Sequence, residues 1–289
     1  MDKTVVVSRS TLAEFWLFIA LTFALSWGFY ALLWLISGGS EPIVEPGPIG
    51  AFGPPLAAAI LTWRIHGSLS PFWSKITRWR IGAGWWMAVL VMPLAILAIG
   101  WVVMAIRGLP LFPDTTPQLW LMPLFLVFML LFGGGQEEPG WRGFALPRLQ
   151  AEMSALWASV IIGILWAAWH LPLFYFAGSG QANLNLVIYF PYVIAISIIH
   201  TWIYNNSGGS VLAVMFLHAM VNLIGGFIPL GVIVEAEVAT LIGAWIVAGA
   251  VLIIYGPSNL SRKHRLQISD LDVAPVGSER RPGRIEEIT

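Results

Sequence analysis

The chain has 289 residues, of which 58% are hydrophobic and only 10% are charged, and its mean hydropathy is +0.79. A water-soluble domain carries about 25% charged residues, so this composition excludes a protein that faces water on all sides and predicts one with much surface in lipid. Basic and acidic residues number 15 each, and this zero net charge argues against nucleic acid as a partner, while the absence of cysteine excludes disulfides and thiolate metal sites.

Eight apolar stretches are candidates to cross a bilayer, which takes about 20 residues each. They lie at residues 14–37, 48–65, 84–106, 118–134, 154–176, 184–204, 209–228 and 238–255. We therefore predict an all-α, polytopic membrane protein with eight transmembrane helices. The first stretch is too long for a cleaved signal peptide. The weakest are the second, which Pro54 and Pro55 interrupt, and the seventh, which is short.

The distribution of lysine and arginine predicts that both termini are cytoplasmic, because short cytoplasmic loops collect these residues. With eight spans, only Arg107 falls on the translocated side. The other side receives Lys3, Arg9, Arg64, Lys75, Arg78, Arg80, Arg142, Arg148, Arg262, Lys263, Arg265, Arg280, Arg281 and Arg284.

The chain is interpreted as one transmembrane domain with two polar ends. Residues 1–13 form a cytoplasmic N-terminus, and residues 14–255 form the membrane domain. Residues 67–83, rich in tryptophan and basic side chains, are expected to form an interfacial helix on the cytoplasmic surface. Residues 256–289 are polar, lack an apolar period and are predicted to be a disordered cytoplasmic tail.

Two adjacent acids follow the fourth predicted span, which carries no charge. Neighbouring side chains point to different faces of a helix, so Glu137 and Glu138 can take different roles. Glu138 and Arg142 are spaced i, i+4, which favours an ion pair that would act as a structural brace. Glu137 is then a candidate general base or acid. The alternative is a cytoplasmic loop in which all three charges are solvated.

Further polar side chains lie inside apolar spans. His170 is in the fifth span, and Trp166 one turn before it could pack against the imidazole. His218 and Asn222 share a helix face in the seventh span and could orient one another or donate to one oxyanion. For each, the alternative is a hydrogen bond between packed helices. His200 has no acidic or amide partner at helical spacing and is interpreted as a packing residue.

Taken together, these residues favour activation of a water molecule and stabilisation of a tetrahedral intermediate. A transporter is disfavoured because the sequence lacks the paired half-length broken helices of a transporter core. A zinc protease of the His-Glu-x-x-His type is excluded because that motif is absent.

The motifs resemble those of the CAAX protease and bacteriocin-processing (CPBP, Abi-type) family of intramembrane proteases, which includes the type 2 CAAX prenyl endopeptidases. The family motifs are Glu-Glu-x-x-x-Arg, Phe-x-x-x-His and His-x-x-x-Asn, in this order. Here they are Glu137-Glu138 with Arg142, Trp166 with His170, and His218 with Asn222, within a core of about residues 118–225. Trp166 in place of the usual phenylalanine is a departure that concerns the shape of the pocket.

The resemblance implies a membrane endopeptidase whose site opens to the cytoplasm. In one family mechanism Glu137 acts with His170 to activate water while His218 and Asn222 stabilise the oxyanion. In the other a divalent metal such as zinc is bound by histidines and an acid, for which Glu137, His170 and His218 are the candidates, because zinc takes three protein ligands and one open position. These two mechanisms stay open.

The predicted function is an intramembrane endopeptidase that acts in the lipid bilayer on a membrane-associated peptide or protein. A prenylated tail, a leader peptide and a transmembrane partner are all compatible substrates. The rival from another class is a non-catalytic membrane protein, such as an immunity or scaffold protein that retains the fold. Such a protein would tolerate loss of the polar residues one at a time.

Overall fold

The computed structural model describes residues 10–38, 48–109, 119–227, 230 and 233–271, and these residues form helices and connections with no β-strand. The all-α prediction is confirmed. Five helical segments are long and apolar enough to cross a membrane. They are α1 (Ser10–Ile36), α4 (Ala83–Ile106), α8 (Ala155–Trp169) with the 3-10 helix η5 (Leu171–Tyr175), α9 (Leu186–Asn206) and α11 (Val234–Tyr255). The chain is therefore an integral, multi-pass membrane protein, while the count of eight spans and the side of the termini stay predictions.

The other three predicted spans contain shorter helices. These are α2 (Gly53–His66), α5 (Met122–Leu131) and α10 (Val211–Gly225). Pro54 and Pro55 begin α2, after the 3-10 helix η1 (Pro48–Phe52), and do not interrupt a longer helix. Proline is tolerated in the first helical turn, where the backbone N–H would have no intrahelical partner.

The segment after α5 lies inside the protein, whereas the alternative interpretation of the sequence was a solvated loop. After a break at residues 132–134 the chain continues through η3 (Gly135–Glu137), α6 (Glu138–Gly140), the π-helical turn η4 (Trp141–Ala145) and α7 (Leu146–Glu152). All residues from 134 to 150 are buried. Broken and π-helical turns of this kind are frequent at functional sites, and here they place the Glu137-Glu138 pair in the protein interior.

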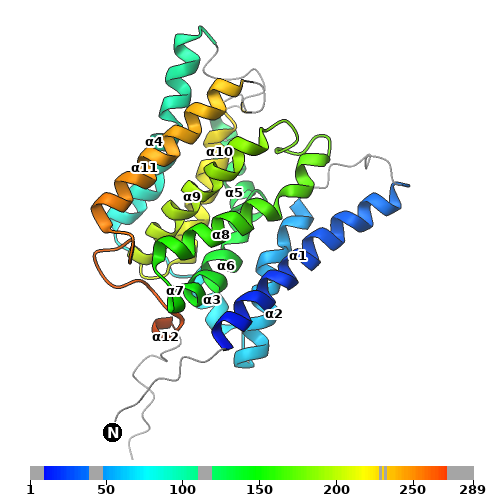
Figure 1. Cartoon of the computed structure of the whole chain (residues 1–289), viewed down its shortest axis with the longest axis vertical. Helices are drawn as coiled ribbons and strands as arrows, with labels where there is room; N and C mark the ends of the chain where they lie inside the picture. The colour runs from blue at the N-terminus through cyan, green and yellow to red at the C-terminus, as the bar shows by residue number, and fades with distance from the viewer. Residues whose placement is uncertain (1–9, 39–47, 110–118, 228–229, 231–232, 272–289) are drawn as a thin grey trace, which may run out of the picture.

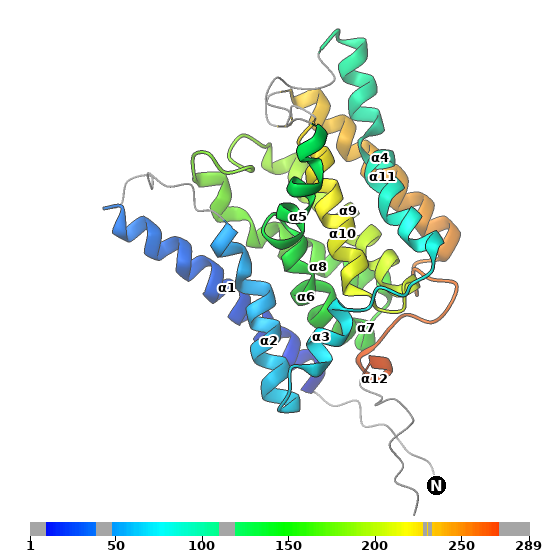
Figure 2. The ribbon, with the colours of Figure 1, turned by 180° about the vertical axis from the view of Figure 1, so that it is seen from behind.

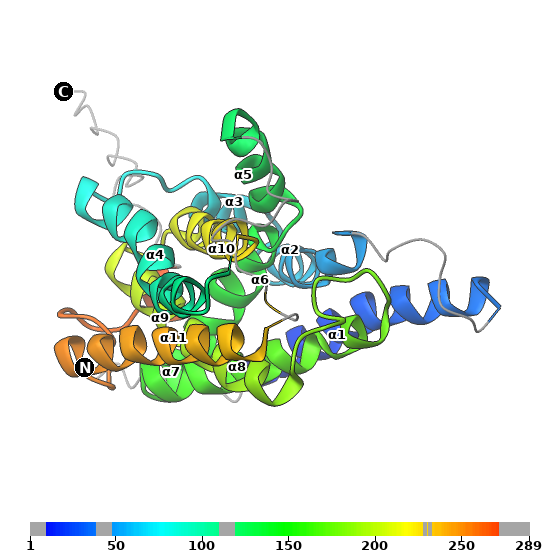
Figure 3. The ribbon, with the colours of Figure 1, turned by 90° about the horizontal axis from the view of Figure 1, so that it is seen from above.

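This broken segment lies at the centre of the helix bundle. Helix α6 contacts α2 on one side and α10 on the other, and the view from above shows it between these helices (Figure 3). Helices α8, α9, α10, α11 and α4 pack against one another, whereas α1 and α2 form a separate pair, as the views from front and back show (Figures 1 and 2).

The two ends of the bundle differ in charge. Helix α3 (Ser70–Ile76), within the predicted interfacial segment, lies at the same end as α7 and α12 (Ile268–Leu271), the lower end in Figure 1. The basic residues at this end are Arg64, Lys75, Arg78, Arg80, Arg148, Arg262, Lys263 and Arg265. We call this end the basic end. At the other end, Arg107 follows α4 and pairs with Glu235 at 3.1 Å.

The prediction of a disordered tail is wrong for residues 256–271, which pack against the basic end. Asn205 donates to the Asn259 carbonyl at 2.8 Å, and Gln150 donates to the Leu266 carbonyl at 2.7 Å. Arg265 Nε donates to the Gln150 carbonyl at 2.7 Å. Backbone carbonyls provide these contacts, which a search for an apolar period does not detect. Residues 272–289 lie outside the described residues.

Candidate active site

Glu137 lies in η3 and is only 3% exposed. Its Oε2 accepts a hydrogen bond of 2.7 Å from the indole Nε1 of Trp166 in α8. The sequence suggested only that Trp166 packs against His170. The two rings do lie near one another, with centroids 6.0 Å apart, but Trp166 also orients the carboxylate of the candidate base.

Glu138 and Arg142 form the ion pair that their spacing predicts. Arg142 Nη1 lies 3.0 Å and 3.1 Å from the two carboxylate oxygens, and both side chains are 0% exposed. Arg142 Nη2 also donates to Ser197 of α9 at 3.1 Å. The alternative of a solvated loop is therefore wrong, because η3, α6 and η4 carry these charges into the bundle. A buried pair of this kind is strongly destabilising to break, since the remaining charge has no water around it.

Glu138 also contacts His218, which sequence spacing does not show. His218 Nδ1 donates to Glu138 Oε1 at 2.8 Å, so this ring presents its Nε2 on the opposite side. Asn222, one turn further along α10, donates through Nδ2 to the Gly133 carbonyl at 2.7 Å. The break after α5 thus holds both predicted α10 residues in place.

Gly134 is required at this break. Its φ is +120°, and a Cβ built there would lie 2.4 Å from His218 Nε2 and 2.6 Å from Asn222 Nδ2. Any side chain would therefore collide with two candidate catalytic groups and strain the backbone.

If the site hydrolyses peptides as the sequence predicts, replacing Gly134 with Ala is expected to lower the rate of peptide cleavage by at least about 100-fold. A displacement of catalytic groups by about 1 Å can have an effect of this size. The measurement is turnover by the purified variant. Gly249→Ala is the matched control, since a Cβ at Gly249, within α11, meets nothing within 4 Å. Wild-type turnover by Gly134→Ala would contradict this placement of His218 and Asn222.

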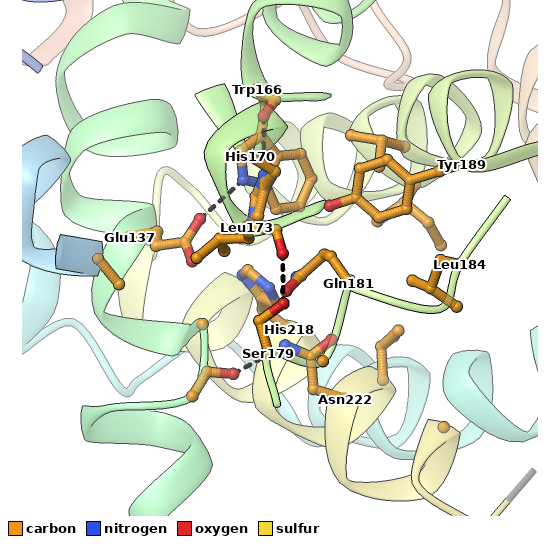
Figure 4. Close-up of a pocket in the computed structure, with 18 of the residues that line it drawn as sticks. Glu137, Trp166, His170, Leu173, Ser179, Gln181, Leu184, Tyr189, His218 and Asn222 are labelled. Atoms are coloured by element: carbon orange, nitrogen blue, oxygen red, sulfur yellow. Dashed lines mark hydrogen bonds between the residues drawn. The ribbon is translucent and has the colours of Figure 1, made fainter. Parts of the chain in front are cut away.

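His170 caps the end of α8. Its Nδ1 donates to the Trp166 carbonyl at 2.8 Å, and a carbonyl can only accept, so Nε2 is the ring nitrogen that faces elsewhere. The ring packs edge-on against Trp169 and Tyr189, with centroid distances of 4.7 Å and 5.8 Å. These contacts fix the orientation of His170, and Figure 4 shows it beside the same space as Glu137, His218 and Asn222.

His200 is close to this group although sequence reasoning left it as a packing residue. Its Nε2 lies 3.9 Å from Glu138 Oε1, and its ring is 5.5 Å from that of His218. A signal was present in the sequence. Ser197, His200, Thr201 and Tyr204 form a polar stripe at i, i+3, i+4 and i+7 on one face of an apolar span, which indicates a face turned toward other protein groups.

Among the described residues, Glu138, His200 and His218 form a buried group that could hold a metal ion, with ligand atoms within 4.8 Å of one another. The candidates from sequence were Glu137, His170 and His218, so only His218 is shared. The hydrogen-bond pattern does not fit an ion. Both Glu138 oxygens already pair with Arg142, and a cation here would lie beside a buried guanidinium and displace the proton of His218 Nδ1.

Glu137, Trp166, His170, His218 and Asn222 line one cavity of about 800 Å³ (Figure 4). Sequence reasoning missed other lining residues, among them Tyr30, Gln181, Tyr189, Tyr192 and Glu237. Helix α5 contributes Phe128 and Met129 near its end, and four other helices contribute one part of their length each. Lining residues lie at 166–170 in and after α8, 188–196 in α9, 218–226 in and after α10, and 237–240 in α11.

This lining places the cavity relative to the two ends of α11. Helix α11 has 22 residues and rises about 33 Å, close to the thickness of a bilayer core. Glu237 at its start lines the cavity, and Arg262 and Lys263 follow its end. The cavity therefore reaches the first turn of α11, at the end of that helix away from the basic end.

Comparison with known proteins supports the resemblance that the motifs indicate. Residues 118–224 match the family model of the type II CAAX prenyl endopeptidase Rce1-like proteins. The chain is also similar to CAAX prenyl protease 2 of Methanococcus maripaludis, with 34% identity over 104 residues. This match covers 34% of the chain and 38% of that protein, so the chain spans well under half of that protein's length.

Proposed function

We propose that this protein is an intramembrane endopeptidase, because residues 118–224 match the family model of the Rce1-like type II CAAX prenyl endopeptidases. It hydrolyses a peptide bond of a membrane-associated substrate by attack of an activated water. One observation carries the proposal: Glu137, His170, His218 and Asn222 come from three separate segments and line one cavity.

In this mechanism Glu137 is the general base. Its carboxylate accepts a proton from water as the water attacks the peptide carbonyl. His170, whose Nδ1 is bonded to the Trp166 carbonyl, has Nε2 as its acceptor nitrogen and helps to transfer the proton to the leaving amine. Trp166 orients Glu137 through its indole N–H.

His218 and Asn222 stabilise the oxyanion. An amide has two N–H donors, and one of those of Asn222 is used by the Gly133 carbonyl, which leaves the other for a substrate oxygen. His218 donates Nδ1–H to Glu138, and this bond orients the ring in the cavity that it lines. Glu138 and Arg142 are thus a structural pair that also positions His218.

Cleavage by the purified protein tests the proposal. The protein in detergent is incubated with a panel of peptides that includes CAAX-type tails, leader peptides and transmembrane segments, and the products are identified by mass. We expect at least one peptide to be cut at an internal bond. If no peptide in any class is cut, the peptidase proposal fails.

Metal content is measured on the same preparation. The paired Glu138 and the Arg142 charge support a mechanism without metal, in which zinc stays far below one equivalent and chelators leave the rate unchanged. One tightly bound zinc per chain, with activity lost on its removal, would support instead the metal-dependent mechanism and a rearranged Glu138, His200 and His218 cluster.

The basic end is proposed to face the cytoplasm. Reporter fusions after residues 75, 148 and 265 should then report the cytoplasm, and fusions after residues 42, 112, 180 and 232 the translocated side. The opposite pattern would contradict this orientation and reverse the protein in the membrane.

A further inference from the structure

The connection between α2 and α4 at the basic end carries a surface that the peptidase site does not use. We propose that residues 63–82 bind the headgroups of anionic phospholipids, with the lipid phosphates on Arg64 and Arg80. This binding holds α3 against the elements that carry the site, so the surface charge of the bilayer changes the rate of the reaction. The binding step stands by itself, and the effect on the rate rests on the proposed peptidase function.

The segment is positively charged. Its basic residues are Arg64, Lys75, Arg78 and Arg80, and it contains no acidic residue. Arg64 and Arg80 are exposed, and within the described part of the chain neither makes a hydrogen bond or an ion pair. Acids at the same end lie on other elements: Glu14 of α1 pairs with Arg148, Glu152 ends α7 and Asp270 lies in α12. Guanidinium groups without a protein partner are suited to bind phosphate oxygens.

The segment lies at the depth of the lipid headgroups. Helix α2 ends at His66 and α4 begins at Ala83. Helix α4 has 24 residues and rises about 36 Å, which exceeds a hydrocarbon core of about 30 Å. Its start therefore reaches the membrane surface, where anionic headgroups attract basic side chains.

Exposed tryptophans favour lipid over a protein as the partner. Trp63, Trp73 and Trp79 are each more than half exposed, and indole rings favour the interface between membrane and water. The guanidinium carbon of Arg80 lies 5.1 Å from the centre of the Trp79 ring, so a cation and an interfacial ring are adjacent. An acidic protein domain would complement the arginines but would leave these rings without the bilayer surface that suits them.

Helix α3 needs a partner outside the protein to stay in place. It has seven residues, and none of them is buried. A helix of this length is not stable in isolation, and its packing against α2, α6, η4 and α10 covers little of it. Headgroups that bind the segment therefore favour its docked arrangement over a detached one.

Hydrogen bonds connect the docked segment with the site. Lys75 Nζ donates to the Gly143 carbonyl of η4 at 3.0 Å, and Arg78 donates to the Gly208 carbonyl before α10. Ser210, whose hydroxyl caps the start of α10, donates to the Arg78 carbonyl. Helices η4 and α10 also carry the buried ion pair and the proposed oxyanion donors. Loss of these contacts is thus expected to disturb the site.

Lipid binding is measured first, without a peptide substrate. The full chain in detergent receives phosphatidylglycerol or phosphatidylcholine, and bound lipid is quantified by native mass spectrometry. We expect phosphatidylglycerol to bind at least about 10-fold more tightly, because each basic residue at an anionic surface contributes about 5-fold. The double variant Arg64→Gln with Arg80→Gln should lose most of this preference. Arg262→Gln with Lys263→Gln removes the same charge from the same end outside the segment and should keep it.

The cleavage rate is then compared in vesicles of phosphatidylcholine with and without phosphatidylglycerol. We expect the wild type to cut at least about 5-fold faster with phosphatidylglycerol, which is within the usual range of coupling between two sites. The Arg64 and Arg80 variant should show nearly equal rates, and the Arg262 and Lys263 variant should behave as the wild type. The same substrate and vesicles are used for all three proteins, so attraction of the substrate to the charged surface cannot explain a difference between them.

Three outcomes would overturn the inference: equal binding of the two lipids, equal wild-type rates in the two vesicles, or an equal loss in both double variants. Inorganic phosphate added to phosphatidylcholine vesicles should not raise the rate, and an increase equal to that with phosphatidylglycerol would also contradict a lipid surface as the partner. If no peptide is cut in either vesicle, the peptidase function fails, and the binding measurement still decides the lipid site.

Discussion

Glu137→Gln is expected to lower turnover by on the order of 10³-fold or more while the protein still folds. General base catalysis contributes about 10²–10⁴-fold, and an amide cannot accept the proton from water. The shape of the side chain is preserved, and the amide oxygen can still accept the hydrogen bond from Trp166 that Oε2 accepts now. The measurements are cleavage rate and thermal stability in detergent.

Glu138→Gln is the comparison, because it makes the same chemical change at the next residue. It removes the partner of a fully buried Arg142, and breaking such a pair lowers the free energy of unfolding by about 3–5 kcal/mol. We therefore expect a clear loss of stability or yield, together with a slower rate because His218 loses its partner. Near wild-type turnover by Glu137→Gln would show that another group is the base.

Hydrophobic runs predicted much of the fold from sequence. The long helices α4, α9 and α11 begin and end within about four residues of their predicted bounds, since a run of about 20 apolar residues has few alternatives to a membrane helix. The polar residues inside the spans also indicated the site, because burying a polar side chain in lipid without a partner has a high free-energy cost.

The sequence did not reveal how deep the Glu137-Glu138 pair lies. Three glycines and a charge cluster after an apolar run are typical of a loop, and only tertiary contacts show that residues 134–150 are buried. The partners of these acids, Trp166 and His218, lie 29 and 80 residues further along the chain. No helical spacing can predict such contacts, and the same holds for the cavity wall formed by Tyr30, Gln181 and Glu237.

Trp166, which replaces the phenylalanine of the family motif, has a hydrogen-bonding role in the structure. A phenylalanine at this position would supply the ring but no donor, whereas the indole N–H of Trp166 binds Glu137. The guanidinium of Arg142 also lies 4.6 Å from the centre of the Trp166 ring. One side chain thus connects the candidate base with the buried ion pair, which indicates that the motifs form a single packed unit.

A final prediction distinguishes an enzyme from a protein that only retains the fold. If His170, His218 and Asn222 serve one transition state, each substitution by alanine should lower turnover by on the order of 10²-fold or more. The double variant of His170 and His218 should lose far less than the product of the two single losses, because residues that act as a unit are strongly non-additive.

Packing residues would behave differently. A hydrogen bond between membrane helices averages about 0.6 kcal/mol, so on that interpretation each substitution would lower the melting temperature modestly, and activity would follow the amount of folded protein. His66→Ala, at the exposed end of α2, controls for loss of a histidine outside the cavity and should change neither quantity. Variants that lose rate and keep their stability support catalysis at the Glu137 site. Variants whose remaining rate only follows stability would make His170, His218 and Asn222 packing residues and the protein a non-catalytic membrane protein that retains the fold.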